Sequence, residues 1–325
     1  MKNYTVRRYN PEDSALWNAF ISTAKNATFL FHRDFMEYHA DRFEDYSLLV
    51  FEEKKLVSVV PVNRVQNTVY SHQGLTYGGF VFNDKIKIGK VIAVMQFALK
   101  FLNENKIDTF QLKLIPSIYH TFFSEEIEYA LFLAHAKLTR RDCLSVLDLT
   151  KDILYSKIRK RGIKKGYLNS LNFIEEDDLS GFWNEILIPN LALKHHVKPV
   201  HSLSEISLLR KKFPNNIRQF NIYHKDKIVA GTTVFVSDNV VHAQYISGND
   251  DKNKLGSLDF LFNYLIKNVF KDKTYFDFGI SHEDKGQKIN EGLLYWKESF
   301  GANSVTQDFY EVATKNYTLL DSIMI

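Results

Sequence analysis

The segment from Val240 to Ala302 constrains the fold most strongly, because strand-like and helix-like patterns alternate along it. Its start, Val240 to Ile246, is rich in β-branched and aromatic residues, which predicts a β-strand. Apolar residues then recur at helical spacing from Leu258 to Val269 and predict a helix with one apolar face. A second strand, Tyr275 to Ile280, and a short helix around Leu293 to Ser299 complete the segment. This order of elements predicts an α/β unit.

A polar loop joins the first of these strands to the long helix and contains two lysines and a glycine. Backbone N–H groups at the start of a helix are unpaired and carry a partial positive charge, which suits a pyrophosphate. We therefore predict that the phosphates of a bound cofactor lie over the start of this helix. The candidate cofactor-binding residues are Ser247, Lys252, Lys254, Leu255, Gly256 and Ser257.

A similar order of elements occurs roughly 170 residues earlier, a spacing that suits a duplicated domain. Leu56 to Val65 predicts a strand, Val91 to Leu102 a helix with one apolar face, and Thr109 to Leu114 a further strand. A chain of 325 residues suits two domains of ordinary size. We expect one domain at residues 1–150 and another at residues 151–325, with the border near Leu149 to Lys151. The alternative is that the halves share only the hairpins and helices common to α/β domains.

Four short motifs follow one another in the second half. They are Tyr245-Ile246, Gly256-Ser257-Leu258-Asp259, Phe276-Asp277-Phe278-Gly279 and Lys297-Glu298-Ser299-Phe300-Gly301. In order and spacing they resemble the C-terminal half of FemAB-like acyltransferases, which are tandem relatives of the GNAT acetyltransferases. The resemblance implies an α/β (α+β) fold of two tandem GNAT-like domains, each with a central mixed β-sheet flanked by helices.

The same resemblance implies how an acyl donor binds. In GNAT folds two adjacent parallel strands splay apart, and the donor pairs with the open edge of the first, here Val240 to Ser247. The usual GNAT phosphate motif, a Gln or Arg followed by two spaced glycines, is reduced here to Asn253-Lys254-Leu255-Gly256-Ser257. The implied donor is therefore acyl-CoA or aminoacyl-tRNA.

Three residues are candidates for catalysis. Lys297 matches the lysine of the family's closing motif, where a cation stabilises the developing oxyanion or, with a lowered pKa, serves as a base. Asp277 alternates with two phenylalanines and faces either a cleft or a loop. Tyr245 is a proton donor for the leaving group or a core residue. Strand alternation places His242 on the other face from Tyr245, so we expect His242 to be structural.

A basic helix is expected from Leu154 to Lys165, with no acidic residue in it. Like charges so close repel one another, and an anionic partner would offset that cost. The partner would be a nucleotide-linked acceptor or tRNA; the alternative is a solvated helix face. Because the first half lacks the catalytic motifs, we expect it to be degenerate and to bind the acceptor. The candidate substrate-binding residues are Arg33, Tyr77, Gly78, Arg159 and Arg161.

Composition excludes several other classes of protein. The net charge of +4 is mild and does not indicate a dedicated nucleic-acid binder. Cys143 is the only cysteine, which fits a reducing cytoplasm. No apolar run approaches the roughly 20 residues of a membrane span, and the N-terminus lacks a signal-peptide core. His195, His196 and His201 have no carboxylate or cysteine at ligand spacing, so we expect no metal site.

Together with these observations, the resemblance to FemAB-like acyltransferases implies a cytoplasmic N-acyltransferase that uses acyl-CoA and acts on the amino group of a nucleotide-linked sugar or cell-envelope precursor. One alternative is an aminoacyl-tRNA-dependent transferase of the FemX type that adds an amino acid to a peptidoglycan precursor. Another is a non-catalytic module that binds an anionic envelope metabolite.

Overall fold

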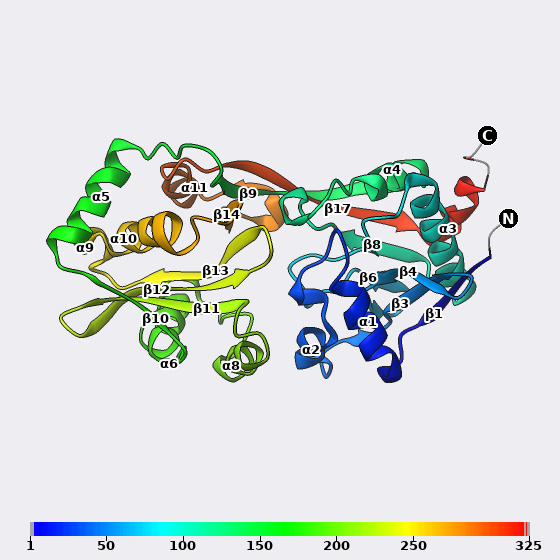
Figure 1. Cartoon of the computed structure of the whole chain (residues 1–325), viewed down its shortest axis with the longest axis horizontal. Helices are drawn as coiled ribbons and strands as arrows, with labels where there is room; N and C mark the ends of the chain where they lie inside the picture. The colour runs from blue at the N-terminus through cyan, green and yellow to red at the C-terminus, as the bar shows by residue number, and fades with distance from the viewer. Residues whose placement is uncertain (1–2, 322, 324–325) are drawn as a thin grey trace. The chain divides into compact units, whose positions relative to one another are not determined.

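The computed structural model describes residues 3–321 and 323 and divides the chain into two compact units (Figure 1). Unit 1 comprises Met1–Asp142 and Thr306–Ile325, and unit 2 comprises Cys143–Val305. The chain crosses between the units within β9 (Lys137–Asp148) and β17 (Asn303–Ala313). This division differs from the border expected near Leu149, because the end of β17 pairs with a strand of the first unit.

Unit 1 contains one antiparallel sheet and one mixed sheet. The antiparallel sheet has the order β1 (Tyr4–Arg8), β3 (Leu48–Glu52), β4 (Lys55–Val60) and β7 (Val81–Phe82). In the mixed sheet β17 lies beside β8 (Thr109–Lys113), followed by β6 (Thr68–Tyr70), β5 (Asn63–Val65) and β2 (Glu44–Asp45). Strands β6 and β8 are parallel.

The strand predicted over Leu56 to Val65 is two strands in the structure. It breaks between β4 and β5, where the chain contains Pro61. Proline has no backbone N–H to donate to a sheet, which explains why the continuous strand was wrong.

The helices of unit 1 cover a large apolar core. They are α1 (Ser14–Ile21), α2 (Arg33–Met36), α3 (Ile88–Glu104) and α4 (Glu126–Leu133), and a 3₁₀ segment (Thr314–Leu320) lies against α3. Helix α3 buries Val91, Met95, Ala98, Leu99 and Leu102, the apolar face predicted from sequence. The chain from β6 to β8 passes through α3, so this helix is the crossover of the parallel strand pair.

Unit 2 is built on a mixed sheet. Its order is β10 (Asn172–Glu176), β11 (Ile217–His224), β12 (Lys227–Val236), β13 (Val240–Gly248), β14 (Tyr275–Ile280) and β9. Strands β13 and β14 are parallel, and the other neighbours are antiparallel. A short hairpin of β15 (His282–Glu283) and β16 (Lys288–Ile289) follows β14.

Helices lie on both faces of this sheet (Figure 1). On one face are α5 (Lys157–Leu168), α9 (Lys252–Leu255), α10 (Ser257–Tyr264) and α11 (Glu291–Glu298), and on the other are α6 (Ser180–Phe182) and α8 (Leu203–Lys212). The chain also forms π-helical turns at Trp183–Leu187 and Leu265–Val269 and helix α7 (Ile188–His195). The buried apolar residues of α10 are Phe260, Leu261 and Phe262, and Leu265 of the following π-helical turn packs in the same core. The predicted α/β architecture of mixed sheets flanked by helices is confirmed.

Among the described residues, no helix is long and apolar enough to cross a membrane.

Candidate active site

The parallel strands of unit 2 separate after a short stretch of pairing. Only three pairs join them: Val240 with Tyr275, Val241 with Phe276, and His242 with Asp277. Strand β13 continues to Gly248, but its later residues do not pair with β14. The edge of β13 therefore opens beside β14 at the level of His242 and Asp277, which is the splayed arrangement that the resemblance implies.

Strand β14 bends sharply at Gly279. The pairing between β14 and β9 shifts between Asp277 and Ile280, and Gly279 has φ of +71°. This left-handed conformation favours glycine, which has no Cβ. Oδ1 of Asp277 accepts a hydrogen bond of 2.6 Å from the backbone N–H of Gly279 and so stabilises the bend.

Lys297 on α11 is directed at this bend. Its side chain is 2% exposed, and Nζ donates hydrogen bonds to the carbonyls of Gly279 at 3.0 Å and Ile280 at 2.5 Å. An ammonium has three donors, and these two carbonyls take two of them. Burial lowers the pKa of Lys297 to about 8, and the nearby Asp277 carboxylate opposes that shift. Lys297 is therefore a buried cation rather than an exposed helix lysine.

Asp277 also contacts His242 across the last pair of the parallel strands. Oδ2 of Asp277 lies 2.9 Å from Nδ1 of His242, and Asp277 is completely buried. An ionised carboxylate only accepts hydrogen bonds, so Nδ1 carries the proton and Nε2 of a neutral imidazole keeps its lone pair. A Cβ on Gly279 would lie 3.3 Å from Cε1 of His242, so the glycine leaves room for the ring.

Strand alternation in the sequence placed His242 on the opposite face of the strand from Tyr245, and this placement is wrong. Thr233 pairs with Tyr245 and Val234 with Ala243, so Gln244 is the extra residue of a β-bulge. Thr233 and Phe235 are two residues apart on β12 and so point to the same face of the sheet. Tyr245 pairs with Thr233 and His242 pairs with Phe235, so Tyr245 and His242 also lie on that face. The alternation used in the sequence analysis fails at the bulge. Aligning the two parallel strands in register would have brought His242 to Asp277.

Tyr245 is packed and hydrogen-bonded rather than open to a ligand. Its hydroxyl lies 2.7 Å from Nδ1 of His201, and its ring packs edge-on against Trp183 with centroids 4.9 Å apart. Burial raises the pKa of Tyr245 to about 12. A phenol that holds its proton more tightly is a weaker acid at neutral pH, so the geometry favours the core interpretation of this residue.

The helix start predicted to hold phosphates is covered by α5. Gly256, with φ of +71°, joins α9 to α10, and a Cβ there would lie 2.2 Å from the carbonyl oxygen of Gly162. Leu255 and Ser257 are buried, and Nζ of Lys165 donates to the Asn253 carbonyl at 3.2 Å. The space above Leu255 to Ser257 is therefore filled by helix packing, contrary to the open phosphate cradle expected from the sequence.

The other residues predicted for the cofactor lie around this helix junction. Ser247 accepts a hydrogen bond of 2.8 Å from the side-chain amide of Asn190. Lys252 is partly exposed and Lys254 is exposed.

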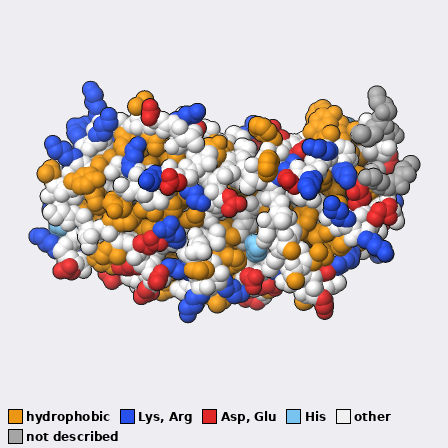
Figure 2. All heavy atoms as spheres, viewed as in Figure 1, with side chains coloured by type: hydrophobic (Ala, Val, Ile, Leu, Met, Phe, Trp, Pro, Cys, Tyr) orange, Lys and Arg blue, Asp and Glu red, His pale blue; other side chains and the backbone are white. Residues whose placement is uncertain are grey.

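Arg159 and Arg161, predicted to bind an acceptor, have different surroundings on α5. Arg159 is buried, forms an ion pair with Asp259, and donates to Oγ of Ser299 at 2.9 Å. It therefore joins α5 to α10 and to the residue after α11, which corrects its predicted ligand-binding role. Arg161 is exposed. Lys and Arg side chains gather over α5 in Figure 2, so a cationic surface is present there.

The predicted acceptor residues of the first half belong to the core of unit 1. Arg33 is buried, pairs with Glu37 at 2.7 Å and with Asp45, and lies 3.7 Å from the centre of the Tyr9 ring. Its charge is already compensated, so the predicted contact with an acceptor phosphate is not available.

Tyr77 and Gly78 are likewise structural. The hydroxyl of buried Tyr77 lies 2.9 Å from Oγ1 of Thr28. A Cβ on Gly78 would lie 2.0 Å from the carbonyl oxygen of Ser71, so this glycine permits a close approach of backbone segments and not of a ligand.

The described residues contain no group of three or more His, Cys, Asp or Glu side chains that could hold a metal ion.

Comparisons with known proteins identify the fold. No family model matches the sequence, and no curated protein matches it. Among solved structures, FemX matches with a TM-score of 0.69 and 9% identity over 98% of this chain and 99% of its own. L-PGS from Bacillus licheniformis matches with a TM-score of 0.61 and 11% identity over 97% and 96%. A tandem GNAT protein from the clavulanic acid biosynthesis pathway matches with a TM-score of 0.52 and 11% identity over 96% and 99%. The tandem GNAT-like fold implied by the sequence motifs is confirmed.

Proposed function

We propose that this chain is an N-acyltransferase whose chemistry takes place where β13 and β14 separate. The observation that carries the proposal is the set of side chains at that point. An Asp277–His242 pair and the buried cation Lys297 meet at the bend of β14. Transfer of an acyl group to an amine needs a base for the amine and a positive group for the oxyanion, and both are present.

His242 is the proposed general base. Asp277 holds the proton on Nδ1, so the lone pair of Nε2 is available to take a proton from the acceptor amine. The amine nitrogen then forms a bond to the carbonyl carbon of the donor, and the bond from that carbon to the leaving sulfur or oxygen breaks. The proton held by His242 passes to the leaving group, which balances the reaction.

Lys297 is the proposed oxyanion contact. With a pKa of about 8 it is mostly protonated near neutral pH, which favours a role as a cation over a role as a base. Its third N–H is the donor for the negative oxygen of the tetrahedral intermediate. The two backbone carbonyls fix the ammonium in advance, and such preorganisation is what makes an electrostatic contact effective.

Two acyl donors are considered, acyl-CoA and aminoacyl-tRNA, and a different observation supports each. The tandem GNAT protein of the clavulanic acid pathway, solved without acetyl-CoA, is similar to this chain and supports an acyl-CoA donor. The filled space above Gly256 and the cationic surface of α5 favour aminoacyl-tRNA, whose phosphates extend over a larger area. The proposed acceptor is the amino group of a nucleotide-linked sugar or cell-envelope precursor, as the FemAB-like motifs imply.

The donor is tested by the mass of the ligand that copurifies with the protein and by direct assay with acyl-CoA and aminoacyl-tRNA. Charge reversal at Arg161 and Lys164, both exposed on α5, should weaken a tRNA donor and leave the KM for acyl-CoA unchanged. If the charge reversal lowers the activity with aminoacyl-tRNA and the activity with acyl-CoA equally, the surface of α5 does not discriminate between the two donors.

The catalytic assignment is tested with His242→Gln. Loss of a general base should lower kcat by about 10²- to 10⁴-fold. His135→Gln, at an exposed histidine of unit 1, is the matched control and should be fully active. Normal turnover by His242→Gln would refute the assignment. If no donor and acceptor pair is turned over by the native protein, the non-catalytic alternative is favoured.

A further inference from the structure

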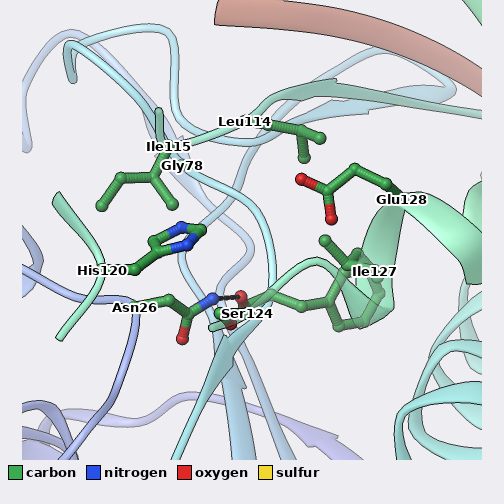
Figure 3. Close-up of a pocket in the computed structure, with 9 residues that line it drawn as sticks. Asn26, Gly78, Leu114, Ile115, His120, Ser124, Ile127 and Glu128 are labelled. Atoms are coloured by element: carbon green, nitrogen blue, oxygen red, sulfur yellow. Dashed lines mark hydrogen bonds between the residues drawn. The ribbon is translucent and has the colours of Figure 1, made fainter. Parts of the chain in front are cut away.

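Unit 1 contains a small pocket beside the start of α4 (Figure 3). Its empty space, counted with the open mouth, is about 230 Å³. Most of that space is the open mouth, and the enclosed part has room for a group about the size of one water molecule. The lining residues are Asn26, Gly78, Phe80, Leu114, Ile115, His120, Ser124, Ile127 and Glu128.

Two side-chain oxygens of this pocket are buried without a hydrogen-bond partner. They are Oε2 of Glu128 and Oγ of Ser124, and Ser124 is 2% exposed. Asn26, in contrast, is fully engaged, because its amide bonds to the backbone of Phe80 at 2.9 Å and Phe82 at 2.8 Å. Buried polar groups are costly unless paired, so a hydrogen-bond donor that enters the pocket would satisfy both oxygens.

The charges around Glu128 are mainly negative. Glu125, Glu126 and Asp308 all raise its pKa, and burial is the largest cause of the shift to about 7. The neighbouring cations are already paired, Lys25 with Glu126 at 2.6 Å and Arg141 with Asp308 at 2.6 Å. Burial lowers the pKa of His120 to about 4, so this ring is neutral near pH 7. An anionic group would be repelled here, and a cation would be attracted.

Two lining residues have exposed aromatic neighbours. Phe132 lies four residues after Glu128 on α4, which places both on one helix face, and it is 72% exposed. Phe123, next to Ser124, is 99% exposed. The rings of exposed phenylalanines can cover an apolar chain or face a cation.

We propose that this pocket binds the primary ammonium group of an alkylamine, such as the end of a lysine side chain. The ammonium donates to Oε2 of Glu128 and Oγ of Ser124, and its alkyl chain leaves past Phe132. None of these residues is proposed to take part in acyl transfer, and ammonium binding can be measured without any enzymatic turnover.

The probe is n-butylammonium chloride, with n-butanol as the uncharged control of equal length. Binding is followed by NMR of protein labelled with ¹³C at the glutamate carboxyl, with the Glu128 signal assigned from Glu128→Gln. The native protein should show a saturable shift of the Glu128 signal with n-butylammonium and none with n-butanol.

Glu128→Gln keeps the shape of the side chain and removes its charge, so it should weaken binding at least about tenfold. Binding to this variant and to the native protein is compared on the backbone amide signals of ¹⁵N-labelled protein. Glu12→Gln removes the same charge from an exposed residue of unit 1 that is not among the charges around Glu128, and it should bind normally. The absence of a saturable shift, equal binding by Glu128→Gln, or equal binding of n-butanol would each overturn the proposal.

The native protein alone provides a second test. The probe stays protonated between pH 6 and 8, because alkylamines have a pKa near 10.4. Glu128 becomes ionised over the same range, so the affinity should rise about tenfold from about pH 6 to about pH 8. An affinity that is constant or falls over this range would contradict binding to the carboxylate.

Discussion

Replacing Lys297 by Met tests the buried cation through its effect on stability. Burial lowers the pKa of this lysine from 10.5 to about 8. A pKa difference of one corresponds to about 1.4 kcal/mol, so the charged form is disfavoured in the folded protein by about 3 kcal/mol. Met keeps most of the apolar length of the side chain and has no charge to desolvate, but it leaves the carbonyls of Gly279 and Ile280 without this donor.

The sign of the pH dependence follows from proton binding. Between about pH 8 and pH 10.5 the unfolded chain holds the Lys297 proton while the folded protein has released it. Stability rises with pH wherever the unfolded state binds more protons, so the folded protein gains about 2 kcal/mol from this group between about pH 7 and pH 9.5. The Met variant lacks this titration. Its stability relative to the native protein should therefore fall by about 2 kcal/mol over the same range.

The assay is urea unfolding at the two pH values, with the native protein, Lys297→Met and Lys271→Met compared. Lys271 is exposed, so its substitution removes a lysine without a desolvation cost and should give the same stability difference at both pH values. If the native protein and Lys297→Met differ by the same amount at both pH values, Lys297 does not have a lowered pKa and the account of its burial is wrong.

Three further substitutions test other contacts. Asp277→Asn should move the proton of His242 from Nδ1 to Nε2 and lower kcat at least about 10²-fold. The ¹⁵N chemical shifts of the His242 ring report which nitrogen carries the proton, and a proton that stays on Nδ1 would contradict this prediction. Gly256→Ala should lower the free energy of unfolding by more than about 1 kcal/mol, because φ is +71° and the Cβ would meet a carbonyl of α5; an unchanged melting temperature would contradict this. Arg159→Met should cost about 3–5 kcal/mol, since it leaves the Asp259 carboxylate largely buried without its partner, and denaturant unfolding at two salt concentrations would measure it.

The elements of unit 2 could be predicted because each depends on local pattern. The strand at Tyr275–Ile280 has the predicted bounds, and the basic helix begins at Lys157, three residues later than expected. The apolar periodicity of α10 and the β-branched run of β13 are properties of neighbouring residues. Such signals are present in the chain before it folds.

The surroundings of single side chains could not be predicted in the same way. A glycine with a positive φ looks identical in sequence whether a phosphate or a helix lies against it, and only the packing of α5 showed that Gly256 faces Gly162. Arginines of the basic helix are equivalent in sequence, yet Arg159 is buried against Asp259 and Arg161 is exposed. Residues distant in the chain decide these outcomes.

The candidate site shows the same division. The sequence alone determined that Asp277 belongs to a strand and Lys297 to a short helix, and their motifs, which are short and local, resemble those of FemAB-like acyltransferases. Only the tertiary structure decided that His242 joins them. The bulge at Gln244 changes the face of the later residues of β13, and the register of β13 with β14 places His242 opposite Asp277. A shift of one residue in strand register would move every side chain of the strand to the other face of the sheet, so register is set by the packing of whole strands. No single stretch of sequence therefore specifies which residues pair.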